Sequence, residues 1–244
     1  MGIYDTKSIR DRLQGNSYVG RGIVVGKTAD ASKAAIAYFI MGRSANSRNR
    51  VFALRGDDVY TEPFDPSKLE DPSLIIYAAV RTLGNQLIVT NGDQTDTIAQ
   101  HLRAGKSFEQ ALQTRAFEPD APNFTPRISA LLRFENGDFS YKLSILKSID
   151  AEGSDCARYT FSYPPKPGLG HFLHTYVRDG SPIPSFQGEP ERTEIPNSID
   201  DFTREIWENL DESNKISLYT RYIDLKTGGM EYRLINKNSE RSLP

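Results

Sequence analysis

Residues 18–26 read YVGRGIVVG, and after the polar turn KTADAS residues 33–42 continue as KAAIAYFIMG. Each stretch is short, rich in aliphatic and aromatic residues, and bounded by turn formers, a pattern typical of β-strands. The two stretches therefore predict a first β-hairpin. Turn signals recur after it at roughly the 8–12-residue spacing of strand-rich folds, so most of the chain is expected to form strands.

Four further hairpins are predicted from pairs of β-rich stretches that surround tight polar turns. Three pairs precede residue 150, and one lies near the end of the chain. They are residues 50–56 with 59–64, 77–83 with 86–90, 128–134 with 139–149, and the two halves of 216–235.

A helical pair interrupts the strands at residues 96–117, where apolar side chains recur at helical spacing. Gly105 is suited to stop the first helix of the pair. Ser107 and Gln110 match the capping box that starts a second helix.

A later helix is predicted at residues 199–210, which carry one apolar face and can be capped by Asn197 or Ser198. Antiparallel strands with a central helical pair and one late helix favour an α+β layered fold. The length is compatible with a single domain over residues 1–244.

Composition narrows the classes of function. The chain of 244 residues is 38% hydrophobic, which suits a buried core, and no run of ~18 apolar residues could span a membrane. The start MGIYDTKSIRDRLQG lacks the features of a secretory signal, so a cytoplasmic location is expected. Cys156 is the single cysteine and offers neither a disulfide nor zinc-type spacing. A net charge of −2 disfavours binding to long nucleic acid, but a local arginine pocket could still hold a small anion.

The first polar cluster is residues 42–50, GRSANSRNR, which connect two predicted strands and carry Arg43, Arg48, Asn49 and Arg50. Guanidiniums so close together repel one another unless an anion or carboxylates lie among them, and arginine suits bidentate phosphate contact. A phosphate site is the functional interpretation. A solvated basic turn explains the residues equally well.

The second polar cluster is residues 90–99, TNGDQTDTIA, which join a strand to a helix start. Helix N-termini present free N–H groups to anions or ribose hydroxyls, and Asp96 could orient a hydroxyl or hold the loop. Asp93, Thr95 and Thr97 would also serve as helix caps, so capping alone can account for this composition.

The third polar cluster is residues 117–130, FEPDAPNFTPRISA, where prolines stiffen the approach to a strand. Such rigid loops can position catalytic groups, but they are also common surface connections. The polar residues are Glu118, Asp120, Asn123, Thr125 and Arg127. Tyr77, in contrast, lies in the apolar stretch LIIYAAVR, whose pattern alone indicates a core side chain.

The order and the residues of these stretches resemble the signature sequence motifs of archaeal-type IMP cyclohydrolases. The likeness spans roughly residues 18–134, and NGDQTDTIA and TPRI are its most specific pieces. The resemblance implies an Ntn-hydrolase-like four-layer αββα sandwich without the autoproteolytic nucleophile. The matching stretches are YVGRGIVVG, GRSANSRNR, LIIYAAVR, VTNGDQTDTIA and NFTPRISA.

The resemblance also implies roles for individual residues. The family's active-site tyrosine, glutamate and arginine match Tyr77, Glu118 and Arg50. Further positions are predicted to contact the substrate. These are Arg21, Arg43, Asn49, Asn91, Thr95, Asp96 and Arg127.

The implied reaction is the dehydrative closure of 5-formamido-1-(5-phosphoribosyl)imidazole-4-carboxamide to IMP, without a cofactor or metal. The expected partner is this small purine ribonucleotide, and assembly into a homo-oligomer is compatible with such a fold. One alternative is a purine-nucleotide sensor that kept the pocket but lost catalysis. Another is a different amidohydrolase on an Ntn-like scaffold, which usually needs an N-terminal Cys, Ser or Thr, whereas this sequence starts Met-Gly.

The part after Ser140 resembles longer bacterial relatives of the enzyme, and its most distinctive segment is residues 170–190, GHFLHTYVRDGSPIPSFQGEP. Whether this segment reaches the site is open. His171 and His174 are three residues apart, but the alternating apolar pattern favours a strand, which would place them on opposite faces. Metal binding is therefore disfavoured.

Overall fold

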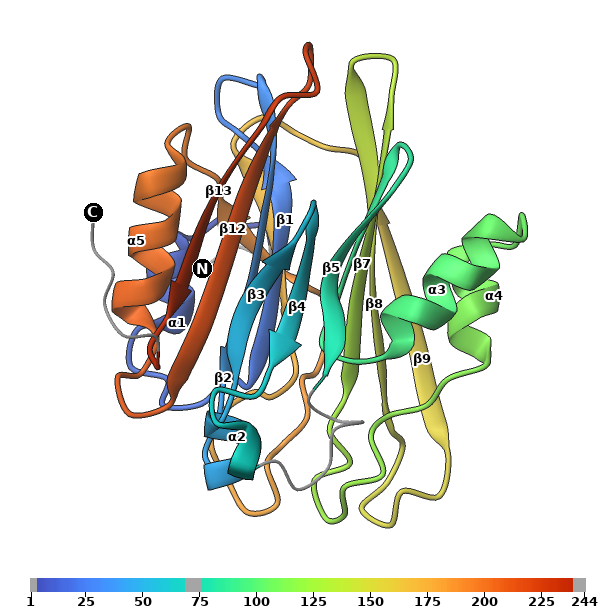
Figure 1. Cartoon of the computed structure of the whole chain (residues 1–244), viewed down its shortest axis with the longest axis vertical. Helices are drawn as coiled ribbons and strands as arrows, with labels where there is room; N and C mark the ends of the chain where they lie inside the picture. The colour runs from blue at the N-terminus through green and yellow to red at the C-terminus, as the bar shows by residue number, and fades with distance from the viewer. Residues whose placement is uncertain (1–3, 69–75, 239–244) are drawn as a thin grey trace.

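Two antiparallel sheets form the centre of the computed structural model, which describes residues 4–68 and 76–238 (Figure 1). The six strands of the first sheet lie in the order β11 (Glu191–Glu194), β10 (Leu169–His174), β1 (Arg21–Lys27), β2 (Lys33–Met41), β12 (Lys215–Asp224), β13 (Met230–Asn236). The seven strands of the second lie in the order β3 (Val51–Arg55), β4 (Asp58–Glu62), β5 (Tyr77–Leu83), β6 (Gln86–Thr90), β7 (Arg127–Glu135), β8 (Asp138–Ser148), β9 (Cys156–Tyr163).

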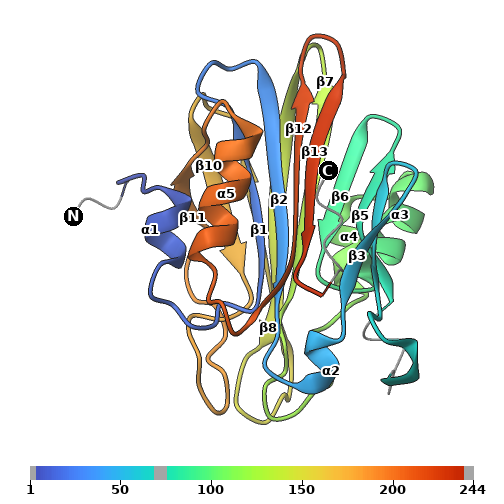
Figure 2. The ribbon, with the colours of Figure 1, turned by 60° about the vertical axis from the view of Figure 1, so that its left-hand side comes forward.

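Helices cover the outer faces of both sheets. The short α1 (Ile9–Leu13) and α5 (Ile199–Asn209) lie against the six-stranded sheet (Figure 2). The pair α3 (Gln94–Arg103) and α4 (Phe108–Gln113) covers the seven-stranded sheet. A helical turn, α2 (Ala45–Arg48), and a 3₁₀ turn, η1 (Pro66–Lys68), lie in loops.

The five hairpins predicted from the sequence are confirmed. Strands β1 and β2 pair antiparallel with Arg21 opposite Ile40 and Ile23 opposite Tyr38. The other predicted pairs, β3 with β4, β5 with β6, β7 with β8 and β12 with β13, are also antiparallel neighbours. The α+β prediction is thereby confirmed.

Each layer boundary has its own apolar cluster. Side chains such as Ile23, Ile36 and Leu143 fill the space between the sheets. Residues of α1 and α5, including Phe202, pack on the outer face of the six-stranded sheet, while α3 and α4 pack through Ile98 on the outer face of the other. The alternation of strand side chains therefore supplies both faces of each sheet with buried apolar groups.

The predicted helical segments are present, although α3 begins at Gln94, two residues before the predicted start, and α4 ends at Gln113. Ser107 and Gln110 form a capping box at the start of α4, and Gly105, with a φ of 72°, follows the end of α3. Ser198 caps α5, because its hydroxyl accepts a hydrogen bond of 3.2 Å from the amide of Asp201. These side chains satisfy amide groups that have no partner within the helix.

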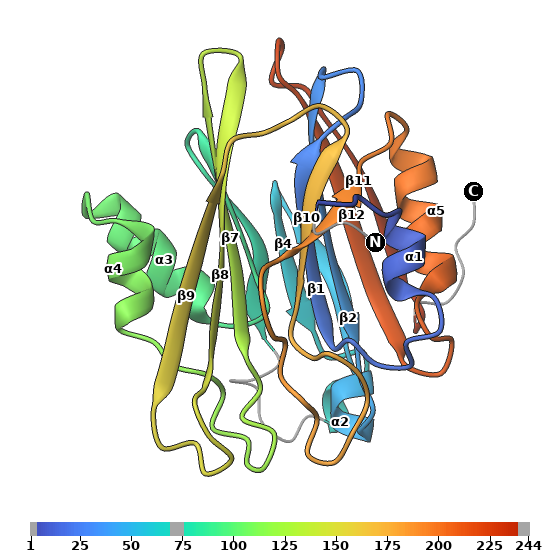
Figure 3. The same cartoon turned by 180° about the vertical axis from the view of Figure 1, so that it is seen from behind.

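Some elements were not predicted. Residues 42–50, expected as a plain polar loop, contain the helical turn α2. The helix α1 is too short to show a helical period. The strand β9 lies at an edge of its sheet (Figure 3). Several of its side chains are exposed, so β9 lacks a clear apolar face.

The histidine prediction is confirmed. His171 and His174 lie on β10 and face opposite sides, since the ring of His171 contacts Tyr141 of the other sheet, whereas that of His174 stacks on Phe172. Among residues 4–68 and 76–238, no group of metal-binding side chains is arranged to hold an ion. Within the same residues, no helix has the length and apolarity needed to cross a membrane.

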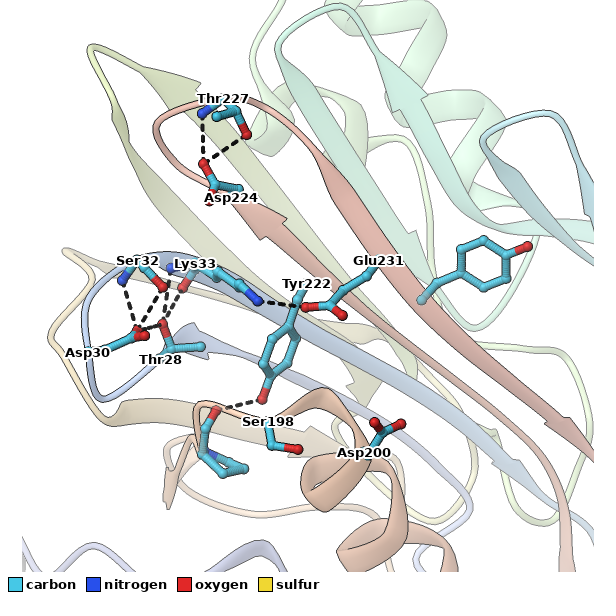
Figure 4. Close-up of polar contacts among 12 residues, drawn as sticks. Thr28, Asp30, Ser32, Lys33, Ser198, Asp200, Tyr222, Asp224, Thr227 and Glu231 are labelled. Atoms are coloured by element: carbon cyan, nitrogen blue, oxygen red, sulfur yellow. Dashed lines mark hydrogen bonds and ion pairs between the residues drawn. The ribbon is translucent and has the colours of Figure 1, made fainter.

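Polar networks fix the turns at one end of the six-stranded sheet (Figure 4). In the β1–β2 turn, the carboxylate of Asp30 accepts hydrogen bonds from the hydroxyls of Thr28 and Ser32. Nearby, Lys33 and Glu231 form an ion pair of 2.7 Å between β2 and β13. The polar residues of the predicted site lie at the opposite end, where β1 begins.

Candidate active site

The start of β3 lies next to α2, at one end of the two sheets (Figure 1). Arg21 lies two residues before Ile23 in β1, and Arg50 lies two residues before Phe52 in β3, so strand alternation turns both toward the inner core. Tyr77, the first residue of β5, also faces this core. The strand ends thus bring three predicted site residues together.

Tyr77 is joined by a second tyrosine. The hydroxyl groups of Tyr38 and Tyr77 are 2.9 Å apart and form a hydrogen bond, and the two residues are 0% and 4% exposed. Burial raises the pKa of both phenols, although Arg50 and Arg21 oppose the rise. Both hydroxyls therefore stay protonated at neutral pH and can donate hydrogen bonds.

Two buried arginines lie beside these phenols, with Arg21 only 8% and Arg50 only 6% exposed. Burial opposes the charge of Arg21, but Tyr18 and Glu118 outweigh it and raise its pKa. Burial and the charge of Arg21 lower the pKa of Arg50.

These two guanidiniums have no counter-ion in contact within the described part of the chain. Over residues 4–68 and 76–238, neither side chain makes a hydrogen bond or ion pair, and Nε of Arg50 is buried without any acceptor. A buried cation without a partner is costly. The arrangement is therefore suited to an anionic ligand that completes it.

Glu118 comes to the cluster on the loop before β7. The amide of Glu118 donates a hydrogen bond of 2.9 Å to the carbonyl of Thr125, which closes the loop. Burial raises the pKa of the Glu118 carboxyl, and Arg21 and Arg127 counteract the rise. A carboxyl that titrates closer to neutrality is suited to accept and return protons.

Taken together, the cluster holds two cations, a phenol that can donate a proton and a carboxyl that can accept one. Such a set can bind an anionic substrate, stabilise an oxyanion and move protons without a bound cofactor.

The predicted phosphate loop does not act as one unit. Arg43 lies at the edge of the cluster, paired with Asp179 and with its guanidinium 5.3 Å from the ring centre of Tyr18. Arg48 turns away and donates to the carbonyl of Gly42 at 3.1 Å. Of the three arginines in residues 42–50, only Arg50 enters the buried cluster.

Asn49, Asn91 and Thr95 hold backbone in place. Asn49 exchanges two hydrogen bonds with the backbone of Asp65, at 2.9 and 2.7 Å. Asn91 accepts from the amide of Ile128 at 2.8 Å, and the hydroxyl of Thr95 donates to a carbonyl of β5 at 2.6 Å. Each side chain ties together segments that carry the site.

The remaining two predicted residues are Asp96, in the first turn of α3, and Arg127, the first residue of β7, whose side chain reaches the start of α3. The carboxylate of Asp96 forms an ion pair with Arg81 and is 57% exposed. Arg127 is buried and donates to the carboxylate of Asp93 at 2.7 Å and to Gln94 at 2.8 Å. Asp93 stands at the cap position of α3, but its carboxylate bonds arginines instead of the helix amides.

The structure adds three tyrosines to the predicted set, namely Tyr18, Tyr38 and Tyr176. Tyr38 alternates with Ile36 and Ile40 along β2, so its pattern matches that of a core residue. The rings of Tyr18 and Tyr176 stack at 5.8 Å, although they come from opposite ends of the sequence. No local signal in the sequence distinguishes them.

The sequence model of a family described as "IMP cyclohydrolase-like protein" matches residues 18–228. The chain belongs to this family. The match includes every residue of the buried cluster, from Tyr18 to Tyr176.

Several archaeal proteins named IMP cyclohydrolase are similar in sequence to this chain. The protein of Methanopyrus kandleri is 35% identical over 118 residues, which cover 47% of this chain and 58% of that protein. The protein of Methanococcus aeolicus is 30% identical over 163 residues, 65% of this chain and 74% of that protein. The protein of Methanocaldococcus jannaschii is 33% identical over 118 residues, 47% of this chain and 56% of that protein. The aligned part thus spans little more than half the length of two of these relatives.

Proposed function

We propose that the protein is an IMP cyclohydrolase, which converts 5-formamido-1-(5-phosphoribosyl)imidazole-4-carboxamide to IMP. The carboxamide nitrogen attacks the formamide carbon, a C–N bond closes the six-membered ring, and the former formyl oxygen leaves as water. The reaction is reversible and needs no oxidant or second substrate. The observation that carries the proposal is that the buried Arg21, Arg50 and Tyr77 meet the partly buried Glu118, in a chain of this family.

The residues have complementary roles in this proposal. The ring closes within one molecule, so the protein must hold the two substituents in reach of each other. The guanidinium of Arg50 stabilises negative charge on the formyl oxygen as the nitrogen attacks. The protonated phenol of Tyr77 donates to the departing oxygen, and the carboxylate of Glu118 accepts a proton from the carboxamide nitrogen.

The two buried cations support an anionic substrate. The ribotide carries a phosphate, and Arg21 and Arg50 lie buried without an acidic partner in contact among the residues that the structure describes. We further propose that Arg43, Asn49, Asn91, Thr95, Asp96 and Arg127 contact the substrate or hold the backbone that does.

A turnover assay tests the proposal. Purified protein is incubated with the formylated ribotide, and the rise of IMP absorbance is followed against a Tyr77→Phe variant. Formation of IMP by the wild-type protein and its loss in the variant support the assignment. Absence of IMP under conditions in which the ribotide binds would refute catalysis and favour the sensor alternative.

Three broader predictions belong to the same proposal. We propose that residues 1–244 form one domain with the Ntn-hydrolase-like αββα arrangement, which the two stacked sheets and their outer helices support. A cytoplasmic location and a homo-oligomeric state stay predictions. Cell fractionation and light scattering of the purified protein test them.

A further inference from the structure

The segment that follows β10, residues 175–187, contacts two parts of the site: the start of β1, which carries Arg21, and the loop that carries Glu118. On one side, the amide of Thr175 donates to the carbonyl of Arg21 at 3.0 Å, and its hydroxyl accepts from the amide of Arg21 at 3.1 Å. On the other side, the amide of Ile183 donates to the side chain of Asn123 at 3.1 Å. This segment therefore connects the start of β1 with the loop that carries Glu118.

Tyr176 makes a further buried connection to the loop that carries Glu118. Its residue is 1% exposed, and its hydroxyl lies 2.6 Å from the hydroxyl of Thr125. The hydroxyl of Thr125 is also bonded to the carboxylate of Asp120, which can only accept. The single proton of Thr125 therefore points to Asp120, and Tyr176 donates its own proton to Thr125.

The chain of hydrogen bonds ends at the backbone of Glu118, the proposed proton acceptor. The carbonyl of Thr125 accepts a hydrogen bond of 2.9 Å from the amide of Glu118. The amide of Thr125 donates a hydrogen bond of 2.6 Å to the carboxylate of Asp120. Tyr176, Thr125 and Asp120 thus form a tether that fixes the ends of the loop. Removal of the Tyr176 hydroxyl therefore takes away a bond that holds this loop to the segment after β10, and it weakens the network that the remaining members share.

We propose that Tyr176 is a positioning residue for Glu118, which acts through the hydroxyl of Thr125. The proposal rests on the assignment of Glu118 to proton transfer. It gives the C-terminal part of the chain a role in the site, since Tyr176 lies in residues 170–190, outside the stretch that carried the sequence resemblance.

Kinetics of Tyr176→Phe test this role. The variant keeps the ring that stacks on Tyr18 and removes only the hydroxyl. A displaced carboxylate is expected to lower kcat about 10- to 100-fold with a smaller change in KM. Thr125→Val should show the same loss, whereas Thr125→Ser retains a hydroxyl and should keep turnover far above that of Thr125→Val. The control is Tyr232→Phe, which removes the hydroxyl of an exposed tyrosine on β13.

A titration of Glu118 tests the tether independently of turnover. The groups that face this carboxyl are Arg21, Arg127, Asp120, Arg50 and Tyr77. The ¹³C carboxyl signal, assigned by its loss in Glu118→Gln, is followed against pH in the wild type and in Tyr176→Phe. Loosening the loop admits water and should bring the pKa of Glu118 down toward its ordinary value, because burial is the largest cause of its rise.

The two readouts separate the two proposals. A wild type that makes no IMP refutes the function, and the carboxyl titration still reports on the tether. An active wild type whose Tyr176→Phe variant has unchanged kcat and an unchanged Glu118 titration overturns the positioning role.

Discussion

Tyr38 and Tyr77 share a hydrogen bond that no water can replace, because both residues are almost fully buried. Replacement of Tyr38 by Phe leaves the Tyr77 hydroxyl in place but removes the partner that orients it. We expect kcat to fall about 10-fold, with little change in KM, since Tyr77 is proposed to act on the departing oxygen. Tyr77→Phe should cost more, about 10²- to 10⁴-fold, the range of proton-transfer groups.

The double variant provides the control for this pair. If the two phenols act as a unit, Tyr38→Phe adds almost nothing to the loss already caused by Tyr77→Phe. Multiplicative losses in steady-state kinetics would show that Tyr38 acts separately. Tyr159→Phe, at an exposed tyrosine of β9, serves as the matched surface control.

In the proposed mechanism, Glu118 makes turnover depend on pH. Its pKa is raised by burial, so the carboxylate that is proposed to accept the proton exists only above this raised value. We expect kcat to fall on the acid side at a pH above the ordinary glutamate value of about 4.5. Glu118→Gln should lose about 10²- to 10⁴-fold in kcat and retain no acid limb in a pH–rate profile. Persistence of the same limb in this variant would assign it to another group.

At the level of the elements, β1 and β10 approach each other through a glycine pair. Gly26 lies opposite Gly170, and a Cβ on Gly26 would come within 2.5 Å of the Cα of Gly170. Gly26→Ala therefore forces backbone apart in the sheet and should lower the free energy of unfolding by about 1–3 kcal/mol or more. Urea denaturation measures this loss. Gly229→Ala is the control, since its Cβ would meet only the hydroxyl of Thr227, at 3.2 Å. Equal midpoints for the two variants would contradict the packing argument.

Elements with strong local signals could be predicted from the sequence. Hairpins such as β1 with β2 combine apolar strands with polar turns, and the capping box at Ser107 marks the start of a helix. Elements without such signals were missed. The strand β9 has half-exposed side chains on both faces, and α1 is held by contacts with distant α5 instead of by its own periodicity.

The site was only partly predictable for a related reason. Arg50, Tyr77 and Glu118 lie in motifs with unusual polar composition, so the family resemblance could single them out. Tyr38 and Tyr176 gain their positions from pairing between distant segments, and in the sequence they match ordinary core tyrosines. The substrate contact of Arg43 stays a prediction, and its ion pair with Asp179 could not be read from its motif, because Asp179 lies far away in the sequence.

Two histidines, His171 and His174, are buried in the apolar layers of the protein. His171 lies between the sheets, with Nδ1 2.7 Å from the hydroxyl of Tyr141 and its ring stacked 3.6 Å from that of Tyr163. His174 donates from Nδ1 to the carbonyl of Tyr176 at 2.7 Å. Burial lowers the pKa of each imidazole to about 4, so both are neutral in the folded protein at neutral pH.

These lowered values make global stability depend on pH. Between about pH 6.5, the ordinary histidine pKa, and about pH 4, the unfolded chain binds protons that the folded chain does not. The free energy of unfolding therefore falls as the pH is lowered through this window, and the histidine contribution levels off below it. Each histidine should account for about 2 kcal/mol of the loss between pH 7 and pH 5.

Urea denaturation at pH 7 and pH 5, followed by the fluorescence of Trp207, measures this dependence. In His171→Gln and His174→Gln the difference between the two free energies should shrink relative to the wild type, even if both variants are less stable at pH 7. The raised pKa values of Glu118 and Glu191 act in the opposite sense, because a carboxyl whose pKa is raised binds its proton more readily in the folded state. The two glutamates contribute equally in the wild type and in His171→Gln. In His174→Gln the contribution of Glu191 can change, because its carboxylate lies 3.9 Å from Nε2 of His174, so His171→Gln gives the cleaner comparison. A pH difference for His171→Gln equal to that of the wild type would mean that this imidazole is protonated within the fold, and that the layer between the sheets admits water at β10.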